Sequence, residues 1–299
     1  MKHQIKTSVI GSYPIKIEAK DLMYKYFNGN EIIWKKYIEE AVNDMVCAGI
    51  DIISDGQTRD PFIQIFTRKL NGCRIRDRTE IVNKVEYIKP ITVDDQIYTR
   101  NILPNNKENI GVLTGPFTLA SSCVNQYYDN SKDLAYDFAY ALSKEAENLQ
   151  KCVDLISIDE PFYSNELPEY SKELIDIIIK KIHLPTRLHV CGDVSKIIPD
   201  LLDMPIDILS HEFKATTNLL NKFNEYSVSK KICLGSVRSD DTKVESVKDI
   251  TNHIKYAYDL FGEKIVQISP DCGQRMLPRK IAFKKLQNLV KAGDIINGR

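Results

Sequence analysis

The sequence predicts an α/β protein, a (β/α)8 TIM barrel, and two features of the chain support this fold class. Short apolar runs rich in β-branched residues recur along the chain, and stretches with a helical spacing of apolar residues lie between them. Each run is mostly apolar, which is typical of a strand buried on both faces of a parallel sheet. Eight such runs alternating with helices within 299 residues favour one closed barrel. We therefore expect residues 1–299 to form a single domain.

The expected elements follow one another at regular intervals. The expected strands are Thr7–Gly11, Asp51–Ser54, Ile110–Thr114, Leu155–Ile158, Arg187–Val190, Ile206–Leu209, Lys231–Leu234 and Ile265–Ile268. The clearest expected helices are Ile32–Ala48, Ser131–Cys152, Pro168–Ile182, Val244–Phe261 and Pro278–Ala292. An open doubly wound sheet is the main alternative. A GxGxxG motif does not follow the first strand, which argues against the dinucleotide-binding form of that sheet.

Residues 70–101 break this alternation. They are highly charged, and their apolar residues alternate with polar ones, which predicts a β-hairpin or small meander inserted after the second βα unit. The simplest role for such an insertion is to cap one end of the barrel, and the docking of a partner molecule is the alternative.

Composition narrows the class of protein. The chain is 43% hydrophobic and 27% charged, as in ordinary globular proteins, and its 41 basic residues balance its 41 acidic ones. This balance gives no reason to expect nucleic acid or an anionic membrane as a partner. No apolar run reaches the roughly 18 residues that span a bilayer, and the N-terminus shows no secretory signal. Seven scattered cysteines do not form a disulfide framework, so we expect a cytoplasmic protein.

Potential metal ligands follow three of the expected strands. Barrel enzymes carry their reactive groups at the C-terminal ends of the strands. His189 and Cys191 end the fifth strand, Glu212 follows the sixth, and Cys272 follows the eighth. Side chains two residues apart on a strand point to the same side, so His189 and Cys191 can reach one ion. One imidazole, two thiolates and one carboxylate suit tetrahedral zinc.

The predicted ligand set also indicates a kind of chemistry. Two thiolates and one carboxylate carry three negative charges, so a Zn²⁺ site built from them would be net −1. Such an electron-rich site is better suited to holding a thiolate than to making hydroxide. A His-x-Cys pair alone is weak evidence, because a buried pair without a metal is its commoner meaning. The later Cys272 and the intermediate Glu212 favour the metal.

A set of short motifs resembles a known family. The motifs are Val9-Ile10-Gly11-Ser12-Tyr13-Pro14, Ser54-Asp55-Gly56-Gln57-Thr58-Arg59, Leu113-Thr114-Gly115-Pro116, Ile158-Asp159-Glu160-Pro161, His189-Val190-Cys191-Gly192, Ser210-His211-Glu212 and Ser269-Pro270-Asp271-Cys272-Gly273. Over essentially the whole chain they resemble the C-terminal catalytic barrel of cobalamin-independent methionine synthase, especially its short, single-barrel archaeal versions. Their order and their placement at strand ends make coincidence a poor explanation.

The resemblance implies roles for these residues. The four candidate ligands would bind catalytic zinc, and the substrate would be L-homocysteine. Ile10, Gly11 and Ser12 would hold its carboxylate, and Asp159 would bind its ammonium group. Gln57 stands where the long enzymes carry Glu, which keeps the hydrogen bonding and loses the charge. From the residues alone, Asp159 could instead start a helix before a proline, and Gly11 could simply form a tight turn.

The chain departs from the long enzymes in two ways. It lacks their N-terminal barrel, which helps to bind a folate donor. It also lacks the His that the long enzymes carry after the seventh strand, a residue thought to move a proton. Asp240 lies near that place and could carry a proton, or it could cap a helix that starts near Val244.

These departures lead us to expect a zinc-dependent methyltransferase of methionine biosynthesis that takes its methyl group from a methylated corrinoid, either methylcobalamin or a corrinoid protein. A Co(I) leaving group needs no proton, so the missing His would not matter. One alternative is transfer from 5-methyltetrahydrofolate, or to another thiol such as coenzyme M. A porphyrinogen decarboxylase-like lyase and a non-catalytic zinc protein are alternatives of other classes.

Overall fold

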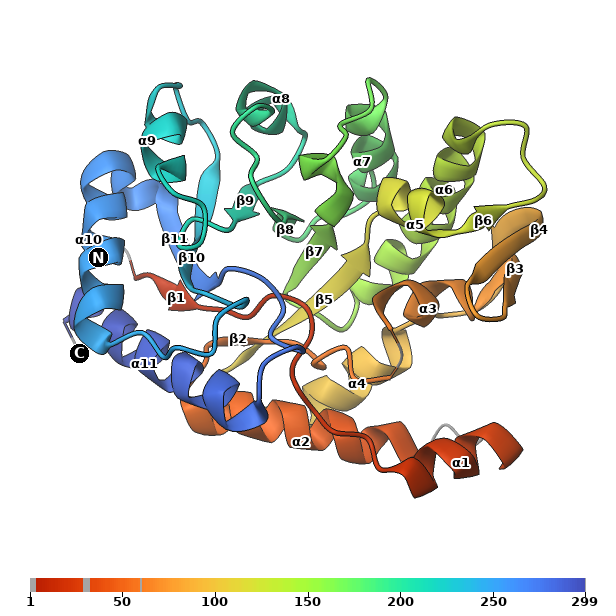
Figure 1. Cartoon of the computed structure of the whole chain (residues 1–299), viewed down its shortest axis with the longest axis horizontal. Helices are drawn as coiled ribbons and strands as arrows, with labels where there is room; N and C mark the ends of the chain where they lie inside the picture. The colour runs from red at the N-terminus through yellow and green to blue at the C-terminus, as the bar shows by residue number, and fades with distance from the viewer. Residues whose placement is uncertain (1–3, 29–32, 60, 299) are drawn as a thin grey trace.

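Eight parallel strands form a closed barrel, surrounded by helices, in the computed structural model, which describes residues 4–28, 33–59 and 61–298 (Figure 1). The barrel strands are β1 (Lys6–Thr7), β2 (Ile52–Ile53), β5 (Glu108–Thr114), β7 (Leu155–Asp159), β8 (Thr186–Val190), β9 (Ile208–His211), β10 (Lys231–Val237) and β11 (Ile265–Pro270). An isolated bridge between Ser8 and Ile52 joins β1 to β2 and completes the ring. The predicted (β/α)8 barrel is confirmed, and each expected strand overlaps or adjoins an observed one.

The helices cover the outside of this ring. They are α1 (Ala19–Asn28), α2 (Ile33–Ala48), α3 (Phe62–Thr67), α4 (Val93–Ile102), α5 (Pro116–Ser122), α6 (Ser131–Leu149), α7 (Ser171–Ile179), α8 (Ile198–Asp203), α9 (Leu219–Asn224), α10 (Val247–Phe261) and α11 (Arg279–Asn297). All five predicted helices occur, although Ile32 lies outside the described residues. The helices that were not predicted are short, six to ten residues each, which leaves little room for a periodic pattern. In the described part of the chain, no helix combines the length and apolar character needed to cross a membrane.

Side chains alternate between the two faces of each barrel strand. On β8, Leu188 and Val190 are fully buried in the core between sheet and helices. Arg187 and His189 point the other way, into the barrel, where they contact residues of other strands. An apolar layer fills part of the interior and consists of Ile10, Ile52, Ile110, Val112, Leu155, Ile208 and Cys233. The interior of the barrel is therefore partly apolar and partly polar, and the polar groups lie inside the opening formed by the C-terminal ends of the strands.

The insertion is shorter than expected. β3 (Leu70–Ile75) and β4 (Thr79–Tyr87) form the antiparallel hairpin, and β6 (Val124–Asn125) pairs with β4 as a third strand. The prediction is wrong for residues 93–101, which belong to α4, where Asp94 and Asp95 in the first turn favour a helix start. The hairpin packs against α6 at the side of the barrel, where Tyr87 bonds to Glu145, so it does not cap the barrel end (Figure 1).

Candidate active site

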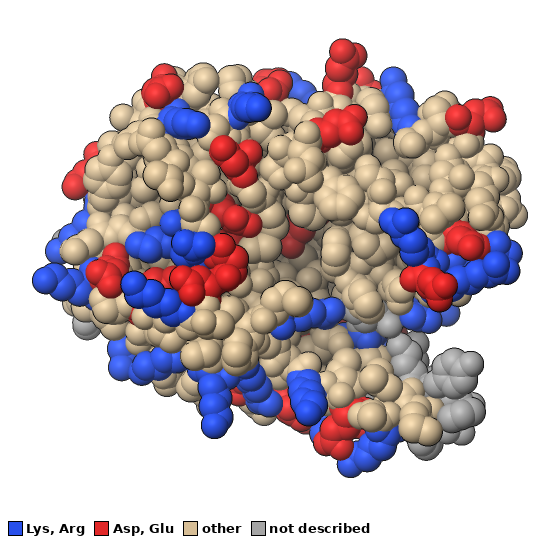
Figure 2. Space-filling view, in the orientation of Figure 1, with Lys and Arg blue, Asp and Glu red and all other residues tan. Residues whose placement is uncertain are grey.

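A cavity of about 320 Å³ opens at the C-terminal ends of the strands. All five predicted substrate residues line it, as do three of the four predicted zinc ligands. These lining residues are Ile10, Gly11, Ser12, Gln57, Asp159, His189, Cys191 and Cys272. Figure 2 shows a hollow near the middle of the face in view, with acidic side chains gathered on one side of it. We call this space the thiol cavity.

Three potential ligand atoms meet at one wall of the thiol cavity. His189 Nε2 lies 3.1 Å from Cys191 Sγ, which lies 2.8 Å from Cys272 Sγ. Each of the three residues offers an atom within 4.8 Å of the others. His189 lies on β8 and Cys191 directly follows its last residue, so the two-residue spacing aims both side chains the same way, and the loop after β11 brings Cys272 across.

A neighbouring hydroxyl fixes the orientation of the His189 ring. Ser210 Oγ, on β9, lies 3.1 Å from Nδ1 and leaves Nε2 facing the two thiols. Burial, reinforced by the charge of Arg187, holds the pKa of His189 well below its usual range. The ring is therefore neutral, which is the form that binds a metal.

The backbone around Cys272 is held on both sides. Ser239 Oγ donates to the carbonyl of Cys272 at 2.6 Å and accepts from its amide at 3.1 Å. A Cβ on Gly273 would lie 2.7 Å from Ser12 Oγ, so the loops after β1 and β11 touch closely at this point. The Gln274 amide also donates to the Ser12 carbonyl at 2.7 Å. These contacts tie the thiol of Cys272 to the predicted carboxylate-binding loop.

Glu212 lies beside this cluster without joining it. Among the described residues, the group within 4.8 Å contains His189, Cys191 and Cys272 only. Burial raises the pKa of Glu212, while the backbone of Gly192 and the thiol of Cys191 hold its carboxylate and oppose that shift. Of the four predicted zinc ligands, the structure thus brings three side chains together, and the carboxylate of the fourth lies beside one of them.

The chemistry of the cluster fits a metal cation. The hydrogen bond between the thiols and their burial raise the pKa of Cys191 well above its usual range. Both sulfurs can be thiolates only if a nearby positive charge compensates them. Two thiolates and one imidazole nitrogen are the ligands that zinc prefers.

Two adjacent carboxyl groups end β7 and serve different purposes. Glu160 accepts hydrogen bonds from the amides of Phe117 and Thr118 at 3.0 and 2.9 Å, and so satisfies the first turn of α5. Asp159 faces the thiol cavity instead, next to His189 in the register of β7 and β8. Burial raises the pKa of Asp159 to about 6, against the opposing charge of Arg187. A short 3-10 helix, Pro161–Ser164, does begin here, with Glu160 at its N-cap position. The helix-start alternative therefore does not apply to Asp159, which faces the cavity and remains available to a ligand.

Gly11 is the point where the predicted ammonium contacts converge. Its φ of +48° lies in the left-handed region, which favours glycine. A Cβ there would lie 3.0 Å from Gln57 Oε1 and 3.6 Å from Asp159 Oδ2. Gln57 is held in turn by Arg275, which donates to its carbonyl. A small amino group could lie between these two side chains.

Asp240 lies outside the thiol cavity. It forms a two-pronged pair with Arg238, at 2.8 and 2.7 Å, and this pairing lowers the pKa of Asp240. The N-cap interpretation is wrong, because α10 starts at Val247 and Ser246 caps it through the amide of Asp249. Asp240 is therefore held as an ion, which makes it a poor proton donor at neutral pH.

The sequence reasoning missed several residues that support the site, namely Arg187, Ser210, Ser239 and Arg275. The two-residue repeat of β8 could have indicated Arg187, which shares a strand face with His189. No comparable signal pointed to Ser239 or Arg275, because both reach the site from loops.

Fold and site together define a barrel enzyme with a thiol-rich centre beside a pocket for a small polar ligand. Residues 5–294 match the model of a protein family described as the cobalamin-independent synthase, catalytic domain, and the chain belongs to this family. The expected family and the expected methyltransferase class are confirmed.

Relatives match along almost the whole chain. A methionine synthase from Methanocaldococcus jannaschii is 39% identical over 97% of this chain and 99% of its own. One from Methanothermobacter marburgensis is 37% identical over 96% of this chain and 99% of its own. Among solved structures, a B12-independent methionine synthase from Shewanella sp. W3-18-1 has a TM-score of 0.83 at 22% identity, covering 99% of this chain and 98% of that one, which shows a shared fold.

The expected corrinoid donor is wrong. The family to which the chain belongs is cobalamin-independent, and its methyl donor is 5-methyltetrahydrofolate, the alternative considered from the sequence. The corrinoid expectation rests on what the chain lacks relative to the long enzymes, including the His after the seventh strand, and an absent feature does not define a donor.

Proposed function

We propose that the protein transfers the methyl group of 5-methyltetrahydrofolate to the thiol of L-homocysteine and so forms methionine. The observation that carries this proposal is a single cavity in which Asp159 and the loop at Gly11 lie beside three side chains of the kinds that bind metals. This arrangement suits a molecule that carries both an amino-acid group and a thiol. Methionine synthases related over nearly the full chain support it.

We propose that His189, Cys191 and Cys272 hold zinc, with Glu212 as the fourth ligand. Bound there, zinc would lower the pKa of the substrate thiol and keep it as a nucleophilic thiolate. Ser210 keeps the ligand nitrogen of His189 aimed at the site, and Ser239 fixes Cys272. The Glu212 carboxylate interacts with the thiol of Cys191, which supports its role as the fourth ligand.

The remaining cavity residues orient the amino acid. In this proposal Asp159 and Gln57 receive the ammonium group, while the backbone of Ile10 to Ser12 and the Ser12 hydroxyl hold the carboxylate. Anchored at that end, the substrate directs its sulfur toward the two cysteines. The thiol loses its proton, a sulfur–carbon bond forms, the N5–methyl bond breaks, and N5 takes up one proton to leave tetrahydrofolate.

Turnover with defined substrates tests the reaction. Purified protein is incubated with 5-methyltetrahydrofolate or methylcobalamin as donor, and with homocysteine or coenzyme M as acceptor. We expect methionine to form from the folate and homocysteine. Failure of the folate donor under conditions in which methylcobalamin supports turnover would contradict the proposed donor, and methylation of coenzyme M alone would contradict the proposed acceptor.

Metal analysis tests the site separately. We expect about one zinc per chain in the purified protein, as a single site requires. Cys272→Ser should lose most of that zinc together with the activity. Cys47→Ser is the matched control, because Cys47 is exposed and lies outside the cavity, and it should retain both. Full zinc content and activity in Cys272→Ser would refute the site.

A further inference from the structure

The loop proposed to hold the substrate carboxylate continues directly into a buried tyrosine. Tyr13 follows Ser12, is 2% exposed and belongs to the hydrophobic core. It is not among the described residues that line the thiol cavity, so any effect on a ligand there must pass through its neighbours. The Tyr13 amide donates to the carbonyl of Gly56 at 2.9 Å, directly before Gln57. Tyr13 therefore connects two of the loops that surround the cavity.

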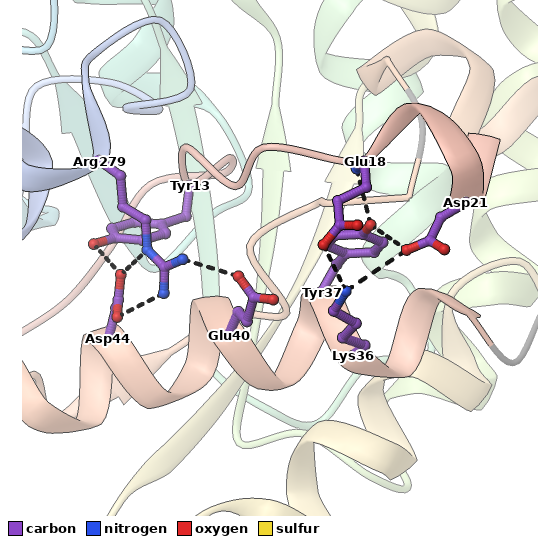
Figure 3. Close-up of polar contacts among 8 residues, drawn as sticks. All are labelled: Tyr13, Glu18, Asp21, Lys36, Tyr37, Glu40, Asp44 and Arg279. Atoms are coloured by element: carbon purple, nitrogen blue, oxygen red, sulfur yellow. Dashed lines mark hydrogen bonds and ion pairs between the residues drawn. The ribbon is translucent and has the colours of Figure 1, made fainter.

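The hydroxyl group of Tyr13 reaches a cluster of charged side chains (Figure 3). It donates to Asp44 Oδ2, on α2, at 3.1 Å. Arg279, the first residue of α11, donates to both oxygens of Asp44, at 2.6 and 3.0 Å, and to Glu40 at 2.9 Å. Burial and the charge of Asp44 raise the pKa of Tyr13 above its usual range, so the hydroxyl keeps its proton and acts as the donor. Asp44 thus joins the segment after β1 to both α2 and α11.

The loop before Tyr13 leaves two hydrogen-bond donors unused. Within residues 4–28, 33–59 and 61–298, the amides of Gly11 and Ser12 donate to no protein group. Their carbonyls are held, because Gly11 accepts from Ser54 Oγ at 3.2 Å and Ser12 accepts from the amide of Gln274 at 2.7 Å. Successive unpaired amides suit an anionic ligand such as a carboxylate. A loop that keeps them unpaired depends on its remaining contacts for its shape.

We propose that Tyr13 is a positioning residue for the amino-acid substrate. Its bond to Asp44 holds the amides of Gly11 and Ser12 in the arrangement that binds the substrate carboxylate. This inference rests on the proposed function, which places the carboxylate at this loop. Because the end of the loop is already fastened to two helices, fewer conformations are lost when the ligand binds. Loss of the hydroxyl should weaken amino-acid binding and leave the zinc ligands in place.

A second tyrosine provides a matched control. Tyr37, on α2, is 1% exposed, and its hydroxyl donates to Asp21 at 2.5 Å and accepts from the amide of Glu18 at 2.9 Å, as Figure 3 shows. These partners lie further along the chain than the loop of Gly11. Tyr37→Phe removes one hydroxyl group with two hydrogen bonds, so it should destabilise the fold at least as much as Tyr13→Phe.

Ligand binding distinguishes the two variants. Calorimetric titration with methionine, the proposed product, measures the affinity of the loop without a methyl donor. We expect Tyr13→Phe to raise the Kd for methionine and the KM for homocysteine about tenfold, with zinc content and kcat close to those of the wild type. Tyr37→Phe should leave both binding values unchanged, although urea denaturation should show at least as large a loss of stability.

Variants at the two carboxylates test how the effect is transmitted. Asp44→Ala removes the partner of Tyr13, so it should raise the Kd for methionine by a similar factor. The double variant with Tyr13→Phe should then bind no more weakly than the weaker-binding single variant, because both changes remove the same interaction. Glu40→Ala is the control, since it removes a partner of Arg279 and leaves the bond between Tyr13 and Asp44, and it should not change the Kd.

The outcomes also separate this inference from the proposed function. Saturable binding of methionine to the wild type, with an unchanged Kd in Tyr13→Phe and Asp44→Ala, would overturn the positioning role alone. Equal weakening in Tyr37→Phe would overturn it too, because a general loss of order would then explain the effect. The absence of methionine binding to the wild type would refute the proposed function itself.

Discussion

Arg187 and Asp159 are joined through one hydroxyl group. Ser157 Oγ accepts a hydrogen bond from Arg187 Nε at 3.2 Å and donates one to Asp159 Oδ1 at 2.8 Å. The fully buried guanidinium also donates to Ser8 Oγ, Val9 O and Gln267 Oε1 at 3.0, 3.0 and 3.2 Å. The fixed positive charge of Arg187 inside the barrel therefore orients Asp159, the carboxylate proposed to bind the ammonium group, through Ser157.

Replacing Arg187 should affect both stability and ligand binding. Arg187→Met leaves several buried polar groups without their donor, so we expect the free energy of unfolding to fall by about 3 kcal/mol. Asp159 also loses its orientation, so the Kd for methionine should rise at least tenfold. Urea denaturation and calorimetric titration measure the two effects. Arg187→Lys keeps the charge and should restore part of the affinity, whereas full affinity in Arg187→Met would refute the positioning role.

Removing the charge of Asp159 should stabilise the ligand-free protein at neutral pH. Burial raises its pKa from 3.8 to about 6, so the folded state retains this proton where the unfolded chain has lost it. Stability is therefore lost as the pH rises from about 4 to about 6. We expect Asp159→Asn to be more stable than the wild type at pH 7.5, by on the order of 2 kcal/mol, and to lose this advantage below pH 4.

Denaturation at both pH values checks this sign, and calorimetry should show that the variant no longer binds methionine. Asp240→Asn is the control. Arg238 lowers the pKa of Asp240, so its replacement should bring no gain at pH 7.5. Equal stability of Asp159→Asn and the wild type at pH 7.5 would count against an uncompensated buried charge.

Ser210→Ala should weaken zinc binding while leaving the fold intact. The substitution removes the group that orients His189 through Nδ1. Loss of such an outer contact typically costs about 10- to 100-fold in metal affinity. Competition with a chromogenic chelator measures the change. Ser122→Ala, on α5, serves as the control, and unchanged affinity in Ser210→Ala would show that the ring is held by packing alone.

Gly11→Ala should impair the binding of the amino-acid substrate. The added Cβ would lie 3.0 Å from Gln57 Oε1 in a backbone with φ of +48°. We expect the KM for homocysteine to rise about tenfold, equivalent to about 1.4 kcal/mol. Gly298→Ala provides a matched control, because its φ is +71° and a Cβ there meets no atom within 4 Å. It should leave the KM unchanged, and an unchanged KM in Gly11→Ala would contradict the proposed binding loop.

The sequence alone predicts the position of a site residue wherever that position follows from the local geometry of a strand. The two-residue repeat of a strand already aimed His189 and Cys191 together, and the order of the strands placed Cys272 at the same mouth. The start of α4 depended on more than the local pattern, because Asp95 is buried against Arg59, which lies far from it along the chain. Glu212 lies outside the group formed by His189, Cys191 and Cys272, and its position depends on the loop after β9, which no periodicity encodes.

The pairing of β1 with β2, which closes the barrel, lies directly beneath the thiol cavity and can therefore be affected by what binds there. Among the described residues, the bridge between Ser8 and Ile52 joins these two-residue strands, and the loops with Gly11 and Gln57 leave from their ends. An amino acid that contacts both loops would hold β1 and β2 together where the barrel closes. Product binding should then slow amide hydrogen exchange in both β1 and β2. Occupancy of the site and closure of the barrel would in that case be thermodynamically linked.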